Sequence, residues 1–138
     1  MMRAVAMNVF GIGIDVVEVG RIASSIGEFG DRFVSKIFTA SERQYCEQRA
    51  RPELHFAARF AAKEAVAKAL GTGIGKELGW LDMEIIRGEN GEPSLLMTGA
   101  GKEFCERHQI TEIKISLTHA KEYAAANAVA LVSTKNIA

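Results

Sequence analysis

The sequence is poor in the residues that mark disulfide-rich, zinc-binding or multidomain proteins. Its 138 residues include two cysteines, two prolines and one tryptophan. Cys46 and Cys105 lie far apart, without the paired spacing of a zinc site, so we expect buried, reduced thiols. Because there is no low-complexity segment and no proline-rich linker, we expect a single domain over residues 1–138.

A long apolar run and an excess of one charge are absent as well. The longest apolar stretch near the N-terminus, residues 9–17, contains Asp15 and is far shorter than the ~20 residues that span a bilayer. The 17 basic and 17 acidic residues cancel, which argues against a general nucleic-acid binder. We therefore expect a cytoplasmic protein that binds neither membrane nor nucleic acid. The charge is unevenly spread, with a net +3 in residues 1–76 and −3 in residues 77–138.

Hydrophobic periodicity and turn signals predict an α+β protein. β-branched and alternating apolar residues predict strands over residues 5–17, 81–87, 94–97 and 113–118, the first of them buried. Helical spacing and capping signals predict helices over residues 21–37, 40–49, 52–70 and 99–108. The capping signals are a capping box at Thr39 and Glu42, Pro52 in a first turn, Gly71 at a helix end and Thr98 as a candidate cap. Gly27 and Gly30 are expected to break the first helix, and the alanine-rich residues 123–132 fit either structure. Strands and helices that do not alternate strictly are typical of the α+β class.

The first candidate for chemistry is the segment Gly11-Ile-Gly13-Ile-Asp15. In a strand, Gly11, Gly13 and Asp15 share one face. Two positions without side chains beside a carboxylate leave room for a ligand and offer oxygen atoms to a metal ion. Alternatively, the glycines mark a close contact between this strand and a helix, with Asp15 at the strand end. The segment is not a dinucleotide-binding fingerprint, because Val16 stands where the third glycine is needed.

The second candidate is the predicted helix that carries Arg59, Lys63, Glu64 and Lys68. Arg59 and Lys63 are spaced i,i+4, as are Glu64 and Lys68, on neighbouring stripes of an alanine-rich helix. A carboxylate among three cations suits a polyphosphate bound with Mg²⁺, whereas the alternative is an ordinary solvated salt-bridge face. The glycine-rich segment that starts at Gly71 follows the helix and lacks the spacing of a phosphate-binding P-loop, so it is interpreted as a helix stop and a turn.

Two further features are weaker when taken alone. His119 ends a predicted strand with a parity that would point it inward, where a lone histidine is more often a core residue than a ligand. Arg21, Arg32 and Lys36 are spaced near multiples of 3.6 residues and would form a basic stripe on a continuous helix. Such a stripe suits an acidic protein partner.

In series, these motifs resemble the small bacterial 4′-phosphopantetheinyl transferases, the holo-acyl-carrier-protein synthase family. The matching segments are, in order, residues 11–15 with 21–22, 38–39 with 42, 59–65 with 68 and 71–73, and 116–119 with 122–124. The resemblance covers about residues 8–132, and residues 1–7 are expected to be an N-terminal extension. Ala120 departs from the Ser, Thr or Asp usual at this position in the family, which is expected to weaken nucleotide binding.

The resemblance implies an α+β subunit with an antiparallel sheet packed with one long and several short helices. It also implies a homotrimer whose active sites lie between subunits, and a strand over residues 123–132. By matching positions, the implied roles of the site residues are Mg²⁺ binding for Asp15 and Glu64, coenzyme A binding for Arg59, Lys68, Gly71 and His119, and carrier-protein binding for Arg21, Arg32 and Lys36.

The implied reaction transfers 4′-phosphopantetheine from coenzyme A to a serine of apo-acyl-carrier protein. Mg²⁺ is required, 3′,5′-ADP is released, and the holo-carrier protein serves fatty acid biosynthesis. Lys68 would stabilise the phosphate oxygens, while Glu64 through a metal-bound water, or else His119, would accept the serine proton. The alternatives are a coenzyme A-binding or carrier-docking module without catalysis, which the intact Asp15, Glu64 and Lys68 argue against, and a metal-dependent phosphohydrolase.

Overall fold

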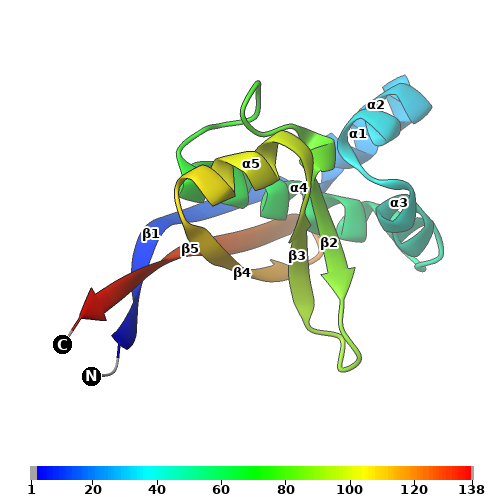
Figure 1. Cartoon of the computed structure of the whole chain (residues 1–138). Coiled ribbons are helices and arrows are strands. Elements are labelled where there is room, and N and C mark those ends of the chain that lie inside the picture. Colours follow the sequence, from blue (N-terminus) through cyan, green and yellow to red (C-terminus); the bar gives the residue numbers. More distant parts are fainter. Residues whose placement is uncertain (1–2, 138) are drawn as a thin grey trace.

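The computed structural model describes residues 3–137, with side chains described for residues 6–133 (Figure 1). In chain order the elements are β1 (Arg3–Glu18), α1 (Val19–Phe29), α2 (Asp31–Ile37), α3 (Ala40–Glu47), α4 (Pro52–Leu70), the 3₁₀ helix η1 (Trp80–Asp82), β2 (Met83–Arg87), β3 (Pro93–Met97), α5 (Gly99–Arg107), β4 (Ile110–His119) and β5 (Tyr123–Ile137). No helix in this described range is both long and apolar enough to cross a bilayer.

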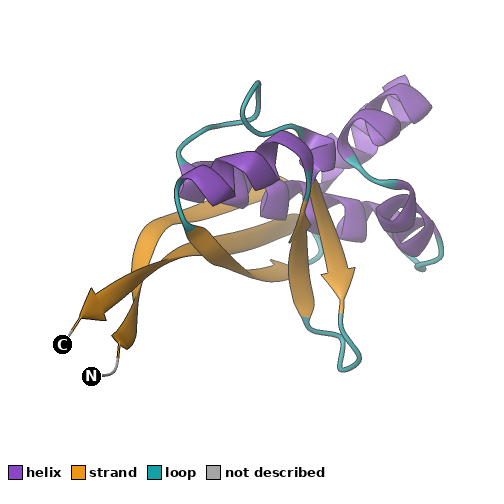
Figure 2. Cartoon of the chain, viewed as in Figure 1, coloured by secondary structure: helices purple, strands orange, loops and turns teal. Residues whose placement is uncertain are grey.

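Two antiparallel sheets organise the chain. The larger sheet has the strand order β1-β5-β4, and β2 and β3 form a separate hairpin. β1 pairs with β5 along nearly its whole length, with one register shift between Val9 and Gly11. Figure 2 shows the helices gathered on one side of the long strands. The predicted α+β class, with antiparallel strands, one long helix and several short helices, is confirmed.

The two faces of β1 have opposite environments. Gly11, Gly13 and Asp15 face α4, as the strand parity predicts. On the other face, Ile12, Ile14 and Val16 are between 61% and 72% exposed. The prediction of a buried strand is therefore wrong for this face, because within one chain the helical layer covers only one side of the sheet.

The two glycines of β1 allow α4 to lie directly on the strand. A Cβ atom on residue 11 would stand 2.0 Å from the carbonyl oxygen of Ala69, and one on residue 13 would stand 1.9 Å from that of Ala65. Neither separation is possible for real atoms, so only glycine permits this backbone approach. Of the two interpretations of the segment, the close strand–helix contact is confirmed for the glycines.

α4 is the central element of the fold. Pro52 stands in its first turn and Gly71 ends it in the left-handed conformation, with φ of 76°, as predicted. Because most of its apolar side chains are alanines, the helix packs closely on two sides. One core lies between α4 and the large sheet with β2 and α5, and the other lies between α4, α1, α2 and α3.

Alanine also explains why residues 123–132 form a strand. The side chains of Ala124, Ala126, Ala128 and Ala130 alternate along β5 and are at most 4% exposed. They lie on the central strand of the sheet, which contacts the alanine-rich face of α4 extensively. Their small volume lets helix and sheet approach, so tertiary packing outweighs the intrinsic preference of alanine for helix.

The turn and cap signals locate most boundaries, with small differences. The Thr39–Glu42 capping box is present at the start of α3. The chain breaks between α1 and α2 only at Gly30, where φ is 56°, and Gly27 lies inside α1. Thr98 precedes α5 without capping it. Instead, a carboxylate oxygen of Asp82 accepts a hydrogen bond from the backbone N–H of Gly101, 3.1 Å away.

The two cysteines are buried and form no disulfide, as predicted. Cys46 is 0% exposed in the helical core, and burial raises the pKa of its thiol to about 12. Burial likewise raises the pKa of Cys105. Both thiols are therefore protonated at neutral pH and act as small apolar groups.

The contact between β1 and α4 predicts that Gly13→Ala is strongly destabilising. The added methyl group forces backbone apart from backbone, so we expect a loss of roughly 1–3 kcal/mol or more in the free energy of unfolding, measured by urea titration. Gly20→Ala on α1 is the matched control, because no other group lies within 4 Å of the position that its new methyl would take, and it should be as stable as the wild type. Equal stability of the two variants would contradict the close-packing argument.

Candidate active site

Asp15 of β1 and Lys68 of α4 form an ion pair where the strand lies against the helix. The ammonium of Lys68 donates to Asp15 Oδ1 at 3.1 Å and to the backbone carbonyl of Ile14 at 2.9 Å. Asp15 is two residues beyond Gly13, so the strand–helix contact that needs glycine also delivers this carboxylate to α4. The Lys68 side chain is 53% exposed and that of Asp15 18% exposed, which leaves both accessible to a ligand.

Glu64 lies one turn before Lys68 on α4 and is half-buried. Its pKa is raised, first by burial and then by the nearby negative charge of Asp15, while the positive charge of Lys68 opposes the shift. The two carboxylates are therefore near enough to repel each other electrostatically, and Lys68 interacts with both. This is an arrangement in which a bound cation would be favourable.

The chemistry of these donors fits Mg²⁺ shared with a phosphate ligand. Carboxylate oxygens are the hard ligands that Mg²⁺ prefers, and its protein sites commonly use one or two carboxylates with substrate phosphates completing the shell. Within residues 3–137 no group of three or more His, Cys, Asp or Glu side chains is arranged to hold a metal alone. Asp15 and Glu64 thus suit a cation that arrives with its phosphate rather than a closed structural site.

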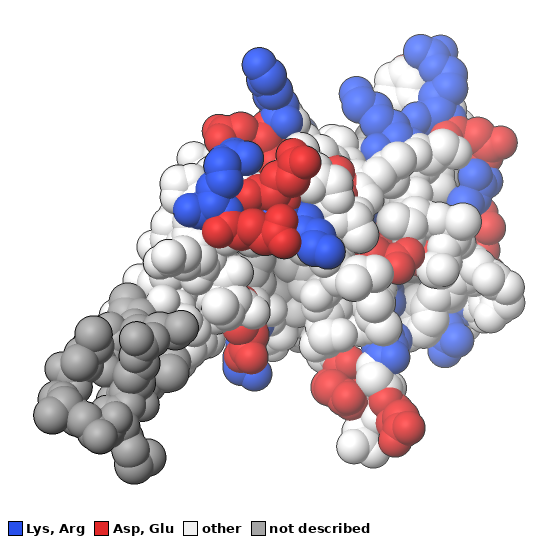
Figure 3. All heavy atoms as spheres, in the orientation of Figure 1, with Lys and Arg blue, Asp and Glu red and all other residues white. Residues whose placement is uncertain are grey.

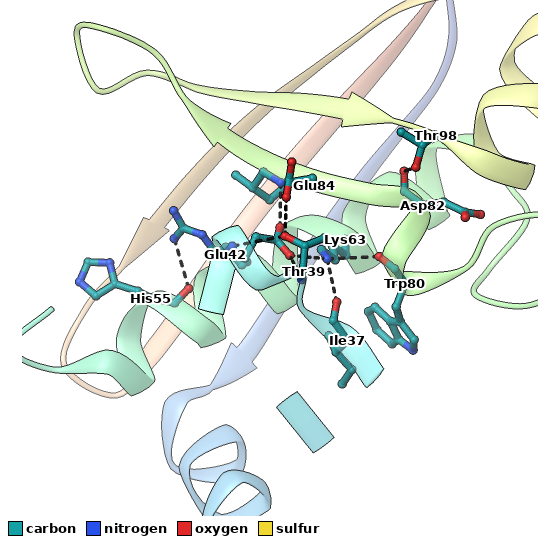
Figure 4. A network of polar contacts seen from close by, with 11 residues as sticks. Ile37, Thr39, Glu42, His55, Lys63, Trp80, Asp82, Glu84 and Thr98 are labelled. Carbon is teal, nitrogen blue, oxygen red and sulfur yellow. Dashed lines mark hydrogen bonds and ion pairs between the residues drawn. The ribbon is translucent and has the colours of Figure 1, made fainter. Parts of the chain in front are cut away.

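Arg59 lies on a different side of α4. It precedes Lys68 by nine positions, about 2.5 helical turns, so the two side chains project in opposite directions. Arg59 is 4% exposed, and its Cζ atom lies 4.3 Å from the ring centroid of Tyr45. One guanidinium N–H donates to the backbone carbonyl of His55 at 3.4 Å, and Figure 4 draws this bond as the dashed line that ends at the labelled His55. Its buried Nε has no hydrogen-bond partner among the described residues.

His119 belongs to the cluster around Arg59. It is exposed at the end of β4, so it is not a buried core histidine, although its ring lies against His55 of α4. The His119 ring lies 5.2 Å from that of His55, centroid to centroid. The pKa of His55 is lowered by burial first, and then by the charges of His119 and Arg59.

Further cations complete this second cluster. Arg49 and Arg87 lie over the Tyr45 ring at 4.3 and 5.4 Å. A cavity of about 380 Å³ is lined in part by Tyr45, Arg59, Glu84 and Arg87. Sequence reasoning missed Tyr45, Arg49, His55 and Arg87, since their spacing shows no periodic pattern and only the fold brings them together.

Lys63 does not join the other cations, which corrects the expected grouping of three cations around Glu64. Its side chain is 0% exposed and forms a 2.7 Å ion pair with the fully buried Glu42 (Figure 4). Burial lowers the pKa of Lys63, while Glu42 opposes that shift. The sequence identifies Glu42 only as half of a capping box. At Lys63 the buried side of α4 faces α3. The spacing of the alanines along α4 does not indicate which of its charged residues lies on that buried side.

The remaining predicted residues are placed as follows. Gly71 ends α4 and opens the loop to η1, and the loop follows the helix as expected. Arg21 on α1 and Arg32 and Lys36 on α2 are all exposed, but Gly30 divides the stripe between two helices. Arg32 and Lys36 remain i,i+4 neighbours on α2. Figure 3 shows basic side chains gathered over α1 and α2, with acidic groups beside them.

Comparisons with known proteins agree with this architecture. The sequence profile of the 4′-phosphopantetheinyl transferase superfamily matches residues 11–128. The chain therefore belongs to this superfamily, and the predicted enzyme class, a phosphopantetheinyl transferase, is confirmed.

Within the superfamily, the chain is similar to holo-[acyl-carrier-protein] synthases. That of Chlamydia trachomatis serovar D is 47% identical over 121 residues, 88% of this chain and 98% of the relative. The crystal structure of the Helicobacter pylori synthase in complex with coenzyme A is 33% identical, with a TM-score of 0.77 over 86% of this chain and 98% of that one. The Bacillus anthracis synthase in complex with CoA (3′,5′-ADP) is 36% identical, with a TM-score of 0.75 over 92% and 99% of the two chains.

The electrostatic coupling of Asp15, Glu64 and Lys68 can be measured directly. Asp15→Asn removes a negative neighbour, so the pKa of Glu64 should fall, while burial keeps it above its ordinary value. Lys68→Met removes the opposing positive charge, so the pKa of Glu64 should rise further. NMR titration of the Glu64 side-chain carboxyl carbon reports both changes. Lys121→Met is the control, and an unaltered Glu64 titration in both site variants would show that the three groups are not coupled.

Proposed function

We propose that this protein transfers the 4′-phosphopantetheine group from coenzyme A to a serine of an apo-acyl-carrier protein, releasing 3′,5′-ADP. The observation that carries the proposal is the constellation of Asp15, Glu64 and Lys68, held together by the glycine-dependent contact of β1 with α4. Similarity to synthases crystallised with coenzyme A supports the choice of donor. The whole chain would act as one transferase domain, supplying holo-carrier protein for fatty acid biosynthesis in the cytoplasm.

Asp15 and Glu64 would hold Mg²⁺ together with the pyrophosphate of coenzyme A. When bound, this ion neutralises phosphate charge and makes the phosphorus a better electrophile. Binding it would also relieve the repulsion that raises the pKa of Glu64. Lys68, which is half-exposed beside both carboxylates, would place its ammonium against the phosphate oxygens as charge builds on them.

The transfer itself exchanges one P–O bond for another. The serine oxygen of the carrier protein attacks the β-phosphate, the bond from that phosphorus to the oxygen of 3′,5′-ADP breaks, and the serine proton must be accepted. A carboxylate oxygen of Glu64 is our first choice of acceptor, because this half-buried side chain lies one turn from Lys68, where the phosphate would bind. His119 is the second choice, since it is exposed and a neutral imidazole has a ring nitrogen that accepts a proton.

We also propose that the active site is completed between subunits of a homotrimer. Arg59 and His119 form one cluster and Asp15, Glu64 and Lys68 the other, on opposite sides of α4. Among the described residues, no hydrogen bond or ion pair joins the two groups, so one coenzyme A molecule would reach both only if a neighbouring subunit supplied the second cluster. The exposed isoleucines and valines of β1 offer an apolar surface for such an assembly. Gly71 would lie near the nucleotide.

The carrier protein would dock on the exposed cations of α1 and α2. Arg21, Arg32 and Lys36 all reach solvent on that side of the molecule. An acidic helix of a carrier protein would be attracted to them, chiefly through faster and better-oriented encounter.

Mass spectrometry tests the transfer. The protein incubated with coenzyme A, Mg²⁺ and an apo-carrier protein should add one phosphopantetheine to the carrier. Glu64→Gln should lower the rate by roughly 10²–10³-fold, as does removal of a charge-stabilising group elsewhere, and so should chelation of the metal. Glu103→Gln, an exposed glutamate on α5, is the control and should transfer normally. Coenzyme A cleaved with an unmodified carrier would favour a phosphohydrolase, and binding without any cleavage would favour a docking module.

Light scattering after gel filtration tests the assembly. Ile12→Lys places a charge on the exposed face of β1, where it should leave the subunit folded but prevent trimer formation and hence transfer. Leu81→Lys, a comparably drastic change at the exposed η1, should remain trimeric. A trimer in the Ile12 variant would rule out this face as the interface.

A further inference from the structure

Lys63 directly precedes Glu64 on α4, yet its side chain points into the protein. It is 0% exposed. Its ammonium donates to Glu42 Oε1 at 2.7 Å, to the backbone carbonyl of Ile37 at 2.7 Å and to that of Trp80 at 3.2 Å (Figure 4). A lysine ammonium has three N–H donors, so all of them are used and all point to different elements.

Glu42 extends the same network in other directions. Its Oε1 also accepts a hydrogen bond from the backbone N–H of Thr39 at 2.9 Å, and its Oε2 accepts one from that of Ile85 at 2.7 Å. The carboxylate is 0% exposed, like the ammonium that it pairs with. One buried ion pair therefore joins α4 to the end of α2, the start of α3, η1 and β2.

Two of these elements carry, or follow in the chain, residues that the proposed function uses. Ile37 is the last residue of α2, the helix that presents Arg32 and Lys36 to solvent. Trp80 begins η1, immediately after the loop that leaves α4 at Gly71. One hydrogen bond from the Lys63 ammonium thus joins the last residue of α2 to α4, next to the proposed metal ligand Glu64.

The buried network around Lys63 and Glu42 is better explained as a means of orienting α2 than as a source of folding stability. Apolar residues of similar volume often stabilise a fold as well as a buried ion pair does, because both charges lose their hydration. Hydrogen bonds, unlike apolar contacts, specify direction and distance. An apolar substitute for Lys63 would fill the same space but would leave the end of α2 held by apolar contacts alone, without the directional bond to the Ile37 carbonyl.

We propose that Lys63, paired with Glu42, is a positioning residue that holds the carrier-docking helix α2 in register with Asp15, Glu64 and Lys68. The serine of a docked carrier protein then reaches the phosphorus of coenzyme A. Lys63 touches neither substrate and acts through α2 and α4. The inference rests on the proposed function and adds to it a device that links carrier docking to catalysis.

Two variants test the proposal in the assembled enzyme. Lys63→Met leaves Glu42 buried and unpaired, so the double variant Lys63→Met/Glu42→Gln, which removes both charges, guards against simple misfolding. Calorimetric titration with coenzyme A counts the competent sites, and kcat is expressed per site. We expect kcat to fall by roughly tenfold to 10²-fold, as for small misplacements of reacting groups. The KM values for coenzyme A and carrier protein should stay within about threefold, because the binding groups remain.

Hydrogen exchange supplies a readout independent of activity. Backbone amides in the last turn of α2 should exchange faster in both variants, because the carbonyl of Ile37 has lost its buried donor. Val66→Ala is the matched control, since Val66 is also on α4 and 0% exposed but belongs to the sheet-side core. It should lower stability while leaving kcat per site and α2 exchange unchanged.

The outcomes are distinct. Wild-type values of kcat per site in both Lys63 variants, or an equal fall in Val66→Ala, would overturn the positioning role. A wild-type protein that binds coenzyme A but transfers nothing would instead overturn the proposed function itself. That result is obtained without any change at Lys63, so it is distinguishable from a failure of the positioning role.

Discussion

The approach of β1 onto α4 is the constraint on which the structure depends. It is possible only because Gly11 and Gly13 have no side chains where the carbonyl oxygens of Ala69 and Ala65 lie. The same contact puts Asp15 beside the turn of α4 that carries Glu64 and Lys68. Packing and chemistry thus share one interface, so a change that separates strand from helix also separates the carboxylates.

α4 divides the molecule into two chemical environments. On its sheet side, Glu64 and Lys68 lie near Asp15 of β1, and on its other side Arg59 packs against the ring of Tyr45. Arg59 and Lys68 are about 2.5 helical turns apart, so their side chains project from opposite sides of α4 and do not enter one pocket of the same subunit. The proposed assembly, in which a neighbouring subunit supplies the second group, would let one ligand contact both.

Signals that act over a few residues were readable from the sequence. The Thr39–Glu42 capping box, Pro52 and Gly71 mark helix ends through local hydrogen bonds and dihedral angles, and each lies where it was expected. The family motif likewise named Asp15, Glu64 and Lys68, which the fold brings together. The burial of Lys63, the exposure of His119 and the open face of β1 were not readable. Each depends on which distant layer covers a given side, and periodicity does not encode that.

The pairing of β1 with β5 has a consequence for how the protein is made. Arg3 pairs with Ile137, so the first and last elements of the described chain are neighbours in one sheet (Figure 1). During synthesis, β1 leaves the ribosome before every other element, and β5, the central strand of that sheet, leaves after them. Until β5 arrives, the backbone of β1 has no strand to pair with and α4 has no complete sheet beneath it. Non-local pairing of this kind slows folding, so until β5 is available, aggregation of the waiting strand competes with closure of the sheet.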